Sequence, residues 1–287
     1  YIPTMEITTE QLQVLAQTHL PADFASAWSA LIRPAVALQP ASDSDPVIGT
    51  LGGVPALGST PWPVWEGHGP LGHVLSIDCA TANALLPELH LPASGHLSFF
   101  YFDGRFNSDY GTVGFWDPTS QAGQRVLHVT DGQGEKAEVP DGLPTFPSVT
   151  LTGQVVATPP SYNHPELGDG WHTVAPENLE AFQLALGELM RSLGPRHQLG
   201  GQAHPIQDAV EFEVAEAMGR VTDPDSFSRD SDSYRILSKD LQLLAQVDSD
   251  PAAQMSWGDM GVLYWERPSS EVNSSSVGSP GFTWQCG

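Results

Sequence analysis

The chain has 287 residues, of which 34 are acidic and 11 are basic, so its formal net charge is −23. A charge of this sign repels nucleic-acid phosphates and anionic lipid surfaces, so neither nucleic acid nor a membrane is expected as a partner. The acidity either keeps the protein soluble or steers a basic partner toward it. No apolar run approaches the roughly 20 residues that cross a bilayer, and no charged-then-apolar leader opens the chain, which predicts a cytoplasmic protein.

The first residues predict helices. Tyr1–Thr4 precede Met5 and are interpreted as an expression-tag remnant. Residues 5–44 are expected to be mainly helical, because apolar residues recur at helical spacing in Thr8–His19 and again in Ala22–Ile32. A short strand is expected at Ala35–Leu38, between two prolines.

The rest of the chain predicts strands and one long helix. Pro176–Leu193 has an apolar face and a Gly-Pro stop, and Val210–Met218 fits either a helix or a strand. The predicted fold class is therefore α+β, with mixed, largely antiparallel sheets and flanking helices. The expected strands, rich in β-branched and aromatic residues, are Val74–Ile77, Leu97–Phe102, Thr112–Trp116, Arg125–Thr130, Val149–Val156, Leu241–Val247, Gly261–Trp265 and Phe282–Cys286.

Three short patterns occur twice in the same order. Leu51–Gly53 recurs as Leu199–Gly201, and LGHVLSID at 71–78 recurs as LQLLAQVD at 241–248. GHLSF at 95–99 recurs as GVLYW at 261–265. These repeats predict two diverged copies of one unit, residues 45–160 and 171–287, packed as a single domain over residues 1–287.

Several motifs also carry a family resemblance. They are LGGVP at 51–55, LPASGHLSFFYFD at 91–103, HQLGGQAHPIQ at 197–207, LLAQVDSD at 243–250 and WGDMGVLYW at 257–265. With them the chain resembles the YwqG-like bacterial family of unknown function. The resemblance implies a mixed α/β fold with paired sheets and no established activity. The first copy lacks the Gln that the family tends to place before Ile-Asp, a pattern kept at Gln246–Asp248.

Candidate site residues concentrate in the second half. His197 is the candidate general base, and Asp248 or Asp259 would act with it. Symmetry could also bring Asp78 close to Asp248. Such strand-ending carboxylates more often cap turns. His197 and His204 are weak metal candidates, because their seven-residue spacing matches no standard ligand motif, and no cofactor is expected.

Aromatic and amide side chains supply the binding candidates. Trp62, Trp65 and Trp257 could form a ligand platform if their indoles are exposed, although packing over the sheet is the alternative. Gln207 and Gln246 complete the candidate binding set.

Function is predicted only as ranked hypotheses. The dinucleotide-binding, phosphate-loop, nucleophile-elbow and zinc-protease motifs are missing. The first hypothesis is therefore a non-catalytic protein that binds a protein partner or small ligand in a groove between the halves, as an immunity-type protein would bind a basic toxin. The alternative is an enzyme of unknown substrate, possibly metal-dependent, with a His/Asp site in the second half. A third interpretation treats all candidates as structural.

Overall fold

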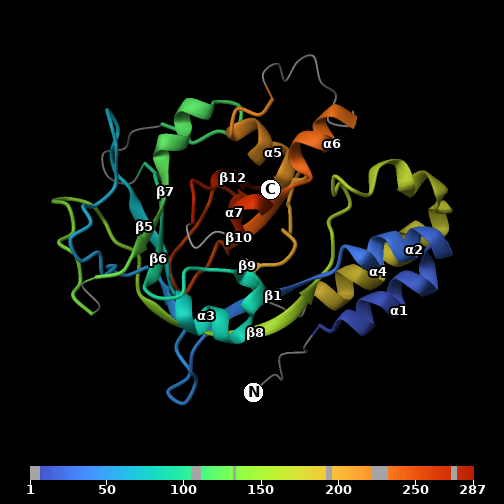
Figure 1. Ribbon diagram of the computed structural model, residues 1–287, viewed down its shortest axis with the longest axis horizontal. Coiled ribbons are helices and arrows are strands. Elements are labelled where there is room, and N and C mark those ends of the chain that lie inside the picture. The colour runs from blue at the N-terminus through green and yellow to red at the C-terminus, as the bar shows by residue number, and fades with distance from the viewer. Residues whose placement is uncertain (1–6, 105–110, 132–133, 192–195, 222–231, 273–276) are drawn as a thin grey trace.

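The computed structural model describes residues 7–104, 111–131, 134–191, 196–221, 232–272 and 277–287, so the expected tag remnant at Tyr1–Thr4 lies outside the described residues. Helices and one large antiparallel sheet make up this structure, which is therefore α+β (Figure 1). No described helix is long and apolar enough to cross a membrane.

Ten strands form the sheet, and every pairing in it is antiparallel. Its order is β12-β11-β10-β9-β1-β8-β2-β5-β6-β7. A separate two-stranded ribbon pairs β3 (Val64–Trp65) with β4 (Gly69–Pro70). The strands are β1 (Arg33–Pro40), β2 (Gly49–Leu51), β5 (Gly72–Asp78), β6 (His96–Tyr101), β7 (Gln124–Val129), β8 (Val149–Thr158), β9 (His197–Gly200), β10 (Leu241–Asp248), β11 (Val262–Pro268) and β12 (Gly281–Gln285).

Four strands lie on each side of the central β1–β8 pair: β9, β10, β11 and β12 beyond β1, and β2, β5, β6 and β7 beyond β8. Leu51 of β2 lies opposite Leu75 of β5, as Leu199 of β9 lies opposite Ala245 of β10. The β5–β6 ladder shifts register between His73 and Leu75, and the β10–β11 ladder shifts between Leu243 and Ala245. The pairs Gly52–Gly53 and Gly200–Gly201, at the ends of β2 and β9, all have positive φ. The two outer groups of four strands thus share register, bulge and turn geometry.

Curvature of the sheet brings its two ends together around one core. The rings of Phe99 on β6 and Trp265 on β11 lie 5.2 Å apart, and those of Tyr101 and Phe282 lie 5.1 Å apart. The amide of Gln124 on β7 accepts from Trp265 Nε1 and donates to Pro280 O. The largest buried cluster therefore contains residues of both groups of strands.

Helices cover the sheet in separate places. The N-terminal pair α1 (Thr9–His19) and α2 (Ala22–Ala30) packs with the long helix α4 (Pro176–Arg191), and Trp28 meets Phe182 edge to face at 5.3 Å. Helix α1 begins with a capping box between Thr8 and Gln11. The remaining helical segments are α3 (Cys79–Leu85), η1 (Pro87–Leu89), η2 (Pro118–Gly123), η3 (Gly168–Thr173), α5 (Val210–Ala217), α6 (Asp232–Ser238) and α7 (Ser269–Val272).

Most sequence-predicted elements are confirmed, including both N-terminal helices, the strand that follows them and the helix from Pro176. The ambiguous segment after residue 209 is the helix α5. The strand predicted at Thr112–Trp116 is wrong, because this segment has no strand pairing and ends in a turn where Asp117 N–H donates to Gly114 O.

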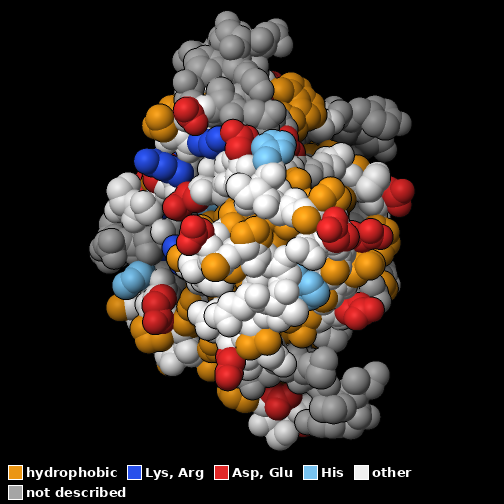
Figure 2. Space-filling model, turned by 90° about the vertical axis from the view of Figure 1, so that its right-hand side faces the viewer, with side chains coloured by type: hydrophobic (Ala, Val, Ile, Leu, Met, Phe, Trp, Pro, Cys, Tyr) orange, Lys and Arg blue, Asp and Glu red, His pale blue; other side chains and the backbone are white. Residues whose placement is uncertain are grey.

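Acidic and basic side chains are distributed differently on the face that Figure 2 shows. Figure 2 looks at the side that carries α1, α2 and α4, where acidic side chains are spread among apolar patches while Lys and Arg gather toward one edge. On this face the acidic side chains are thus not confined to one patch.

Candidate functional site

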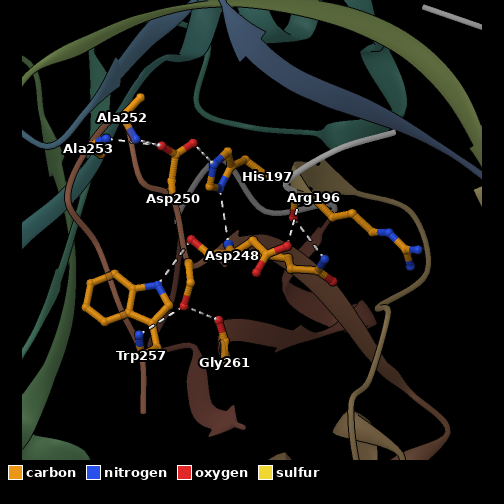
Figure 3. A network of polar contacts seen from close by, with 10 residues as sticks. Arg196, His197, Asp248, Asp250, Ala252, Ala253, Trp257 and Gly261 are labelled. Atoms are coloured by element: carbon orange, nitrogen blue, oxygen red, sulfur yellow. Dashed lines mark hydrogen bonds and ion pairs between the residues drawn. The ribbon is translucent and has the colours of Figure 1, made fainter. Parts of the chain in front are cut away.

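His197, the predicted base, is the centre of a buried polar network (Figure 3). Its Nδ1 accepts the backbone N–H of Asp248 at 3.1 Å, so the ring proton lies on Nε2 and is donated to Asp250 Oδ2 at 3.0 Å. Asp250 also accepts the backbone N–H groups of Ala252 and Ala253. These hydrogen bonds, chiefly that from His197, lower the pKa of Asp250 to about 2.

This network leaves His197 poorly placed for chemistry. Both of its ring nitrogens are occupied, and only 2% of its side chain is exposed, so neither nitrogen reaches solvent, a substrate or a metal in this arrangement. The carboxylate of Asp248 accepts the Arg196 backbone N–H at 3.0 Å instead of facing the imidazole. Asp78, its counterpart in the first half, caps α3 by accepting the Thr81 N–H at 2.7 Å. Asp78 thus follows the turn-capping alternative, whereas Asp248 holds the backbone of a residue distant in sequence.

The aromatic candidates do not form a common exposed platform. The expectation for Trp257 needs correction, because this indole is 3% exposed, donates to Asp248 O and packs edge-on against Tyr101 and Phe146. Trp62 is half-buried, and its Nε1 donates to Leu71 O. Trp65 is also half-buried and stacks on His68 at 3.8 Å.

Two more of the predicted positions, Asp259 and Gln207, lie at the surface. Asp259 is exposed, and its carbonyl accepts the Gly287 N–H at 3.0 Å. Gln207 is exposed as well, and it is held through its backbone N–H, which donates to Gln285 Oε1. Neither side chain meets His197 in a shared site.

The loop from Gly201 to Ala209, between β9 and α5, is held in one conformation by buried side chains. Gln246, which is fully buried, accepts the His204 N–H and donates to Arg196 O, both at 2.9 Å. The Tyr264 hydroxyl donates to His204 O at 2.8 Å. Gln285 accepts from Ile206 and Gln207 and donates to Asp208 O. Such a fixed loop is suited to a binding site, because loops positioned by a rigid scaffold commonly carry binding residues.

A first pocket lies beside this loop; we call it the Arg196 pocket. Its cavity is about 320 Å³, and it contains three of the predicted residues, His204, Gln246 and Asp248. Arg196 lines it with a guanidinium whose Nη1 is buried without a partner among the described residues. Burial and the charge of Arg196 lower the pKa of His204 to about 4. The remaining lining is apolar: Met190, Ile206, Met260 and Val262.

A second pocket is a gap in the sheet, which we call the notch. Strand β9 pairs with β10 only through Gln198 and Leu199, and β1 joins β9 from Ala35 onward. Beyond Gly200, residues Arg33–Pro34 and Leu241–Leu244 therefore border a cavity of about 230 Å³. Residues of the first half close it from the other side. The notch is lined by Leu31, Arg33, Pro34, Leu86, Glu88, Leu89, His164, Glu166, Gly200–Ala203, Glu211, Lys239, Leu241–Leu244, Glu266 and Arg267.

Two adjacent charged residues of β11 reach the notch from opposite faces of the sheet. Glu266 is 1% exposed and Arg267 is 3% exposed. Glu266 Oε2 and Arg267 Nη1 are buried with no hydrogen-bond partner among the described residues, while Arg267 Nη2 donates to Leu89 O at 2.6 Å. Unpartnered buried polar atoms destabilise a fold, and a ligand that supplied the missing partners would remove this cost.

The surroundings of Glu266 disfavour its ionised form. Burial, and then the charge of Glu211, raise the pKa of Glu266 well above its ordinary value, and Arg220 opposes the shift only in part. Glu211 also lines the notch, with its Oε1 3.8 Å from His164 Nε2. Two buried carboxyl groups thus lie at one pocket, and the pKa of one of them is raised.

In the first half, side chains occupy the position that corresponds to the notch. His73 of β5 has the register position that Leu243 has in β10, and its ring contacts Gly53 O at 3.1 Å and Ser76 Oγ at 2.8 Å. Phe146 O accepts the Gly53 N–H at 3.0 Å. Burial lowers the pKa of His73 to about 4. The two groups of strands therefore share a framework, but the notch belongs to the second.

The sequence pointed to this region but missed its charged groups. Glu211, Glu266 and Arg267 were not predicted, although a Glu-Arg pair directly after the apolar run GVLYW is an unusual pattern for a strand. Glu266 is buried near Glu211 of α5, and Arg267 is buried against Leu89 of the first half; residue spacing shows neither contact. Among the residues described, no three His, Cys, Asp or Glu side chains gather in a way that could hold a metal ion.

Comparison with known proteins adds a family but no activity. A family model described as "Domain of unknown function (DUF1963)" matches residues 49–286. Comparison with curated proteins gives no match.

Proposed function

The chain thus belongs to the DUF1963 family, whose function is unknown, and we propose from its own geometry that it is a non-catalytic binding protein for a small molecule seated in the notch. The observation that carries this proposal is the pair of unpartnered buried atoms, Glu266 Oε2 and Arg267 Nη1. The ligand would carry a cationic amine or guanidinium group for Glu266 and an oxygen acceptor for Arg267.

Binding of the cation would be linked to proton release. Burial and the charge of Glu211 raise the pKa of Glu266 and so favour its protonated form, whereas an adjacent cation would favour the carboxylate. The ligand would therefore displace a proton, and its affinity would rise with pH up to the pKa of Glu266 in the empty site.

Calorimetric titration tests the proposal with defined probes: methylamine, guanidinium, putrescine, lysine and arginine. We expect lysine or arginine to bind about tenfold more tightly than methylamine, because their carboxylate also reaches Arg267. Titration in two buffers of different ionisation enthalpy should show proton release. Glu266→Gln should weaken binding at least tenfold, since an amide cannot ionise.

Glu188→Gln on α4 is the matched control, because it removes the same charge at an exposed position outside the notch. The thermal midpoint of Glu266→Gln should not fall below that of the unmodified protein, since the variant retains a neutral group of the same shape. The proposal fails if no probe binds at 10 mM, or if both variants bind equally well.

Several broader features also belong to the proposal. Equal register, bulges and glycine turns in the two groups of strands support an origin by duplication of one unit. The continuous sheet and shared core support a single domain. Membership of the YwqG-like bacterial group and a cytoplasmic location are proposed on the sequence motifs and composition.

A further inference from the structure

We propose that the Arg196 pocket binds a small organic anion, whose carboxylate or phosphate group bonds to the Arg196 guanidinium and His204 while its apolar part packs on the pocket wall. This site is independent of the notch: the two cavities share no lining residue.

The guanidinium of Arg196 is the donor that lacks an acceptor. Its Nη2 donates to Met190 O at 3.4 Å, which is a long hydrogen bond, and its Nη1 is buried with no partner among the described residues. A guanidinium offers five N–H donors in a planar fork that matches carboxylate and phosphate oxygens. An oxyanion is therefore the ligand chemistry that satisfies it.

Gln246 fixes the two recognition groups relative to each other. One end of its amide accepts from the His204 backbone and the other donates to the Arg196 backbone, so a single buried side chain joins the two positions. Both His204 and Arg196 line the pocket, on either side of Gln246. Gln246 is thus a positioning residue, and its counterpart in the first half is Ser76.

The charged and titratable side chains that line the pocket are Arg196, His204 and Asp248, and the Tyr264 hydroxyl donates to the His204 carbonyl behind it. Asp248 already accepts the Arg196 backbone N–H, and its negative charge opposes a bound anion. The anionic group must therefore lie on the guanidinium side. Replacing Asp248 with Asn should tighten anion binding, whereas it would weaken binding of a cation.

The apolar lining of the Arg196 pocket indicates that the ligand also carries an apolar group. Two methionines, one isoleucine and one valine complete the lining. Methionine side chains adapt to varied apolar shapes. Butyrate and benzoate should therefore bind more tightly than acetate or inorganic phosphate.

The experiment is an NMR titration of the intact protein with these four anions, following the His204 imidazole. Butyrate or benzoate should raise the pKa of His204 by at least one unit, because an anion offsets the charge of Arg196 and favours the imidazolium. Arg196→Gln should reduce butyrate affinity at least tenfold, and Arg196→Lys by about tenfold, since lysine keeps the charge but loses the fork.

Arg125→Gln, at an exposed position on β7, removes the same charge elsewhere and should leave the titration unchanged. A folded Arg196→Gln variant that binds butyrate as well as the unmodified protein would overturn the proposal. Equal affinity for all four anions, or weaker binding by Asp248→Asn, would also overturn it.

Discussion

At the scale of single residues, the buried polar side chains of the second half divide into two classes. His197, Asp250 and Gln246 have their hydrogen-bonding atoms occupied by neighbours, so they fix the backbone around them. Arg196, Glu266 and Arg267 each keep a buried atom without a partner among the described residues. Residues of the first class fix the shape of the two pockets. Residues of the second class give the pockets their proposed capacity to bind, because only unpartnered groups gain hydrogen bonds from a ligand.

Asp250→Asn tests the first class. The amide would turn an N–H group toward His197 Nε2–H or lose the backbone donors of the following turn, so we expect the free energy of unfolding at pH 7 to fall by about 2 kcal/mol. Because its folded pKa is about 2 against an ordinary value of 3.8, Asp250 stabilises the fold above about pH 4 and loses this effect as pH falls toward 2.

Urea unfolding at pH 7, 4 and 2.5 would measure this difference between variant and unmodified protein, which should shrink toward acid. Asp45→Asn is the control, since Asp45 also accepts hydrogen bonds from Ser42 but lies exposed. Asp45→Asn should change the free energy of unfolding little. A difference for Asp250→Asn that persists unchanged at pH 2.5 would contradict the assigned role.

At the scale of elements, the glycine pair after β9 lets the chain turn out of the sheet and opens the notch. Gly201 has φ +74°, and a Cβ there would lie 2.6 Å from both Ala35 Cβ and Thr158 Oγ1. Thr158 Oγ1 also accepts the Gln202 N–H at 2.8 Å. The turn thus needs glycine for its backbone angle and for the space between β1 and β8.

Gly201→Ala should therefore lower the free energy of unfolding by more than Gly67→Ala does. Gly67 has φ +84° but nothing within 4 Å of a Cβ, so its substitution reports backbone strain alone, about 1 kcal/mol. The additional loss of unfolding free energy in Gly201→Ala, which we expect to be about 1–3 kcal/mol, measures the steric clash. Denaturant unfolding of the two variants makes the comparison, and equal losses would show that the space around Gly201 is not limiting.

Elements were more predictable from the sequence than the site they build. Amphipathic spacing located α1, α2 and α4, because helix faces and caps are local properties. Sequence placed His197, Gln246 and Asp248 in one region but gave His197 the role of a base, since nothing local shows that the Asp248 N–H occupies its Nδ1. The notch was missed because it arises where β9 ends between β1 and β10, which is a property of strand order.

At the scale of the whole molecule, the N-terminal strand β1 lies in the middle of the sheet. It pairs with β8 over its full length on one edge and with β9 on the other. The family match begins at residue 49, after β1 has ended at Pro40. The matched region alone therefore lacks the strand that joins its two groups of strands.

A chain that starts at residue 45 should consequently fail to form the native sheet, whereas one that starts at residue 31 should retain it. The second chain loses α1 and α2 but keeps β1, so it controls for removal of N-terminal residues in general. Circular dichroism and dispersion of amide NMR signals would distinguish the two. A well-dispersed spectrum from the chain starting at residue 45 would contradict a central role for β1.

The position of β1 also has a consequence for synthesis. The ribosome releases this segment before it has made either partner strand, and translation of the intervening first half takes roughly 10 s. During that interval Val36 and Leu38, both buried in the native sheet, have no native strand beside them. We therefore expect β1 to pair first with β8 and to gain its second neighbour only when β9 has been made.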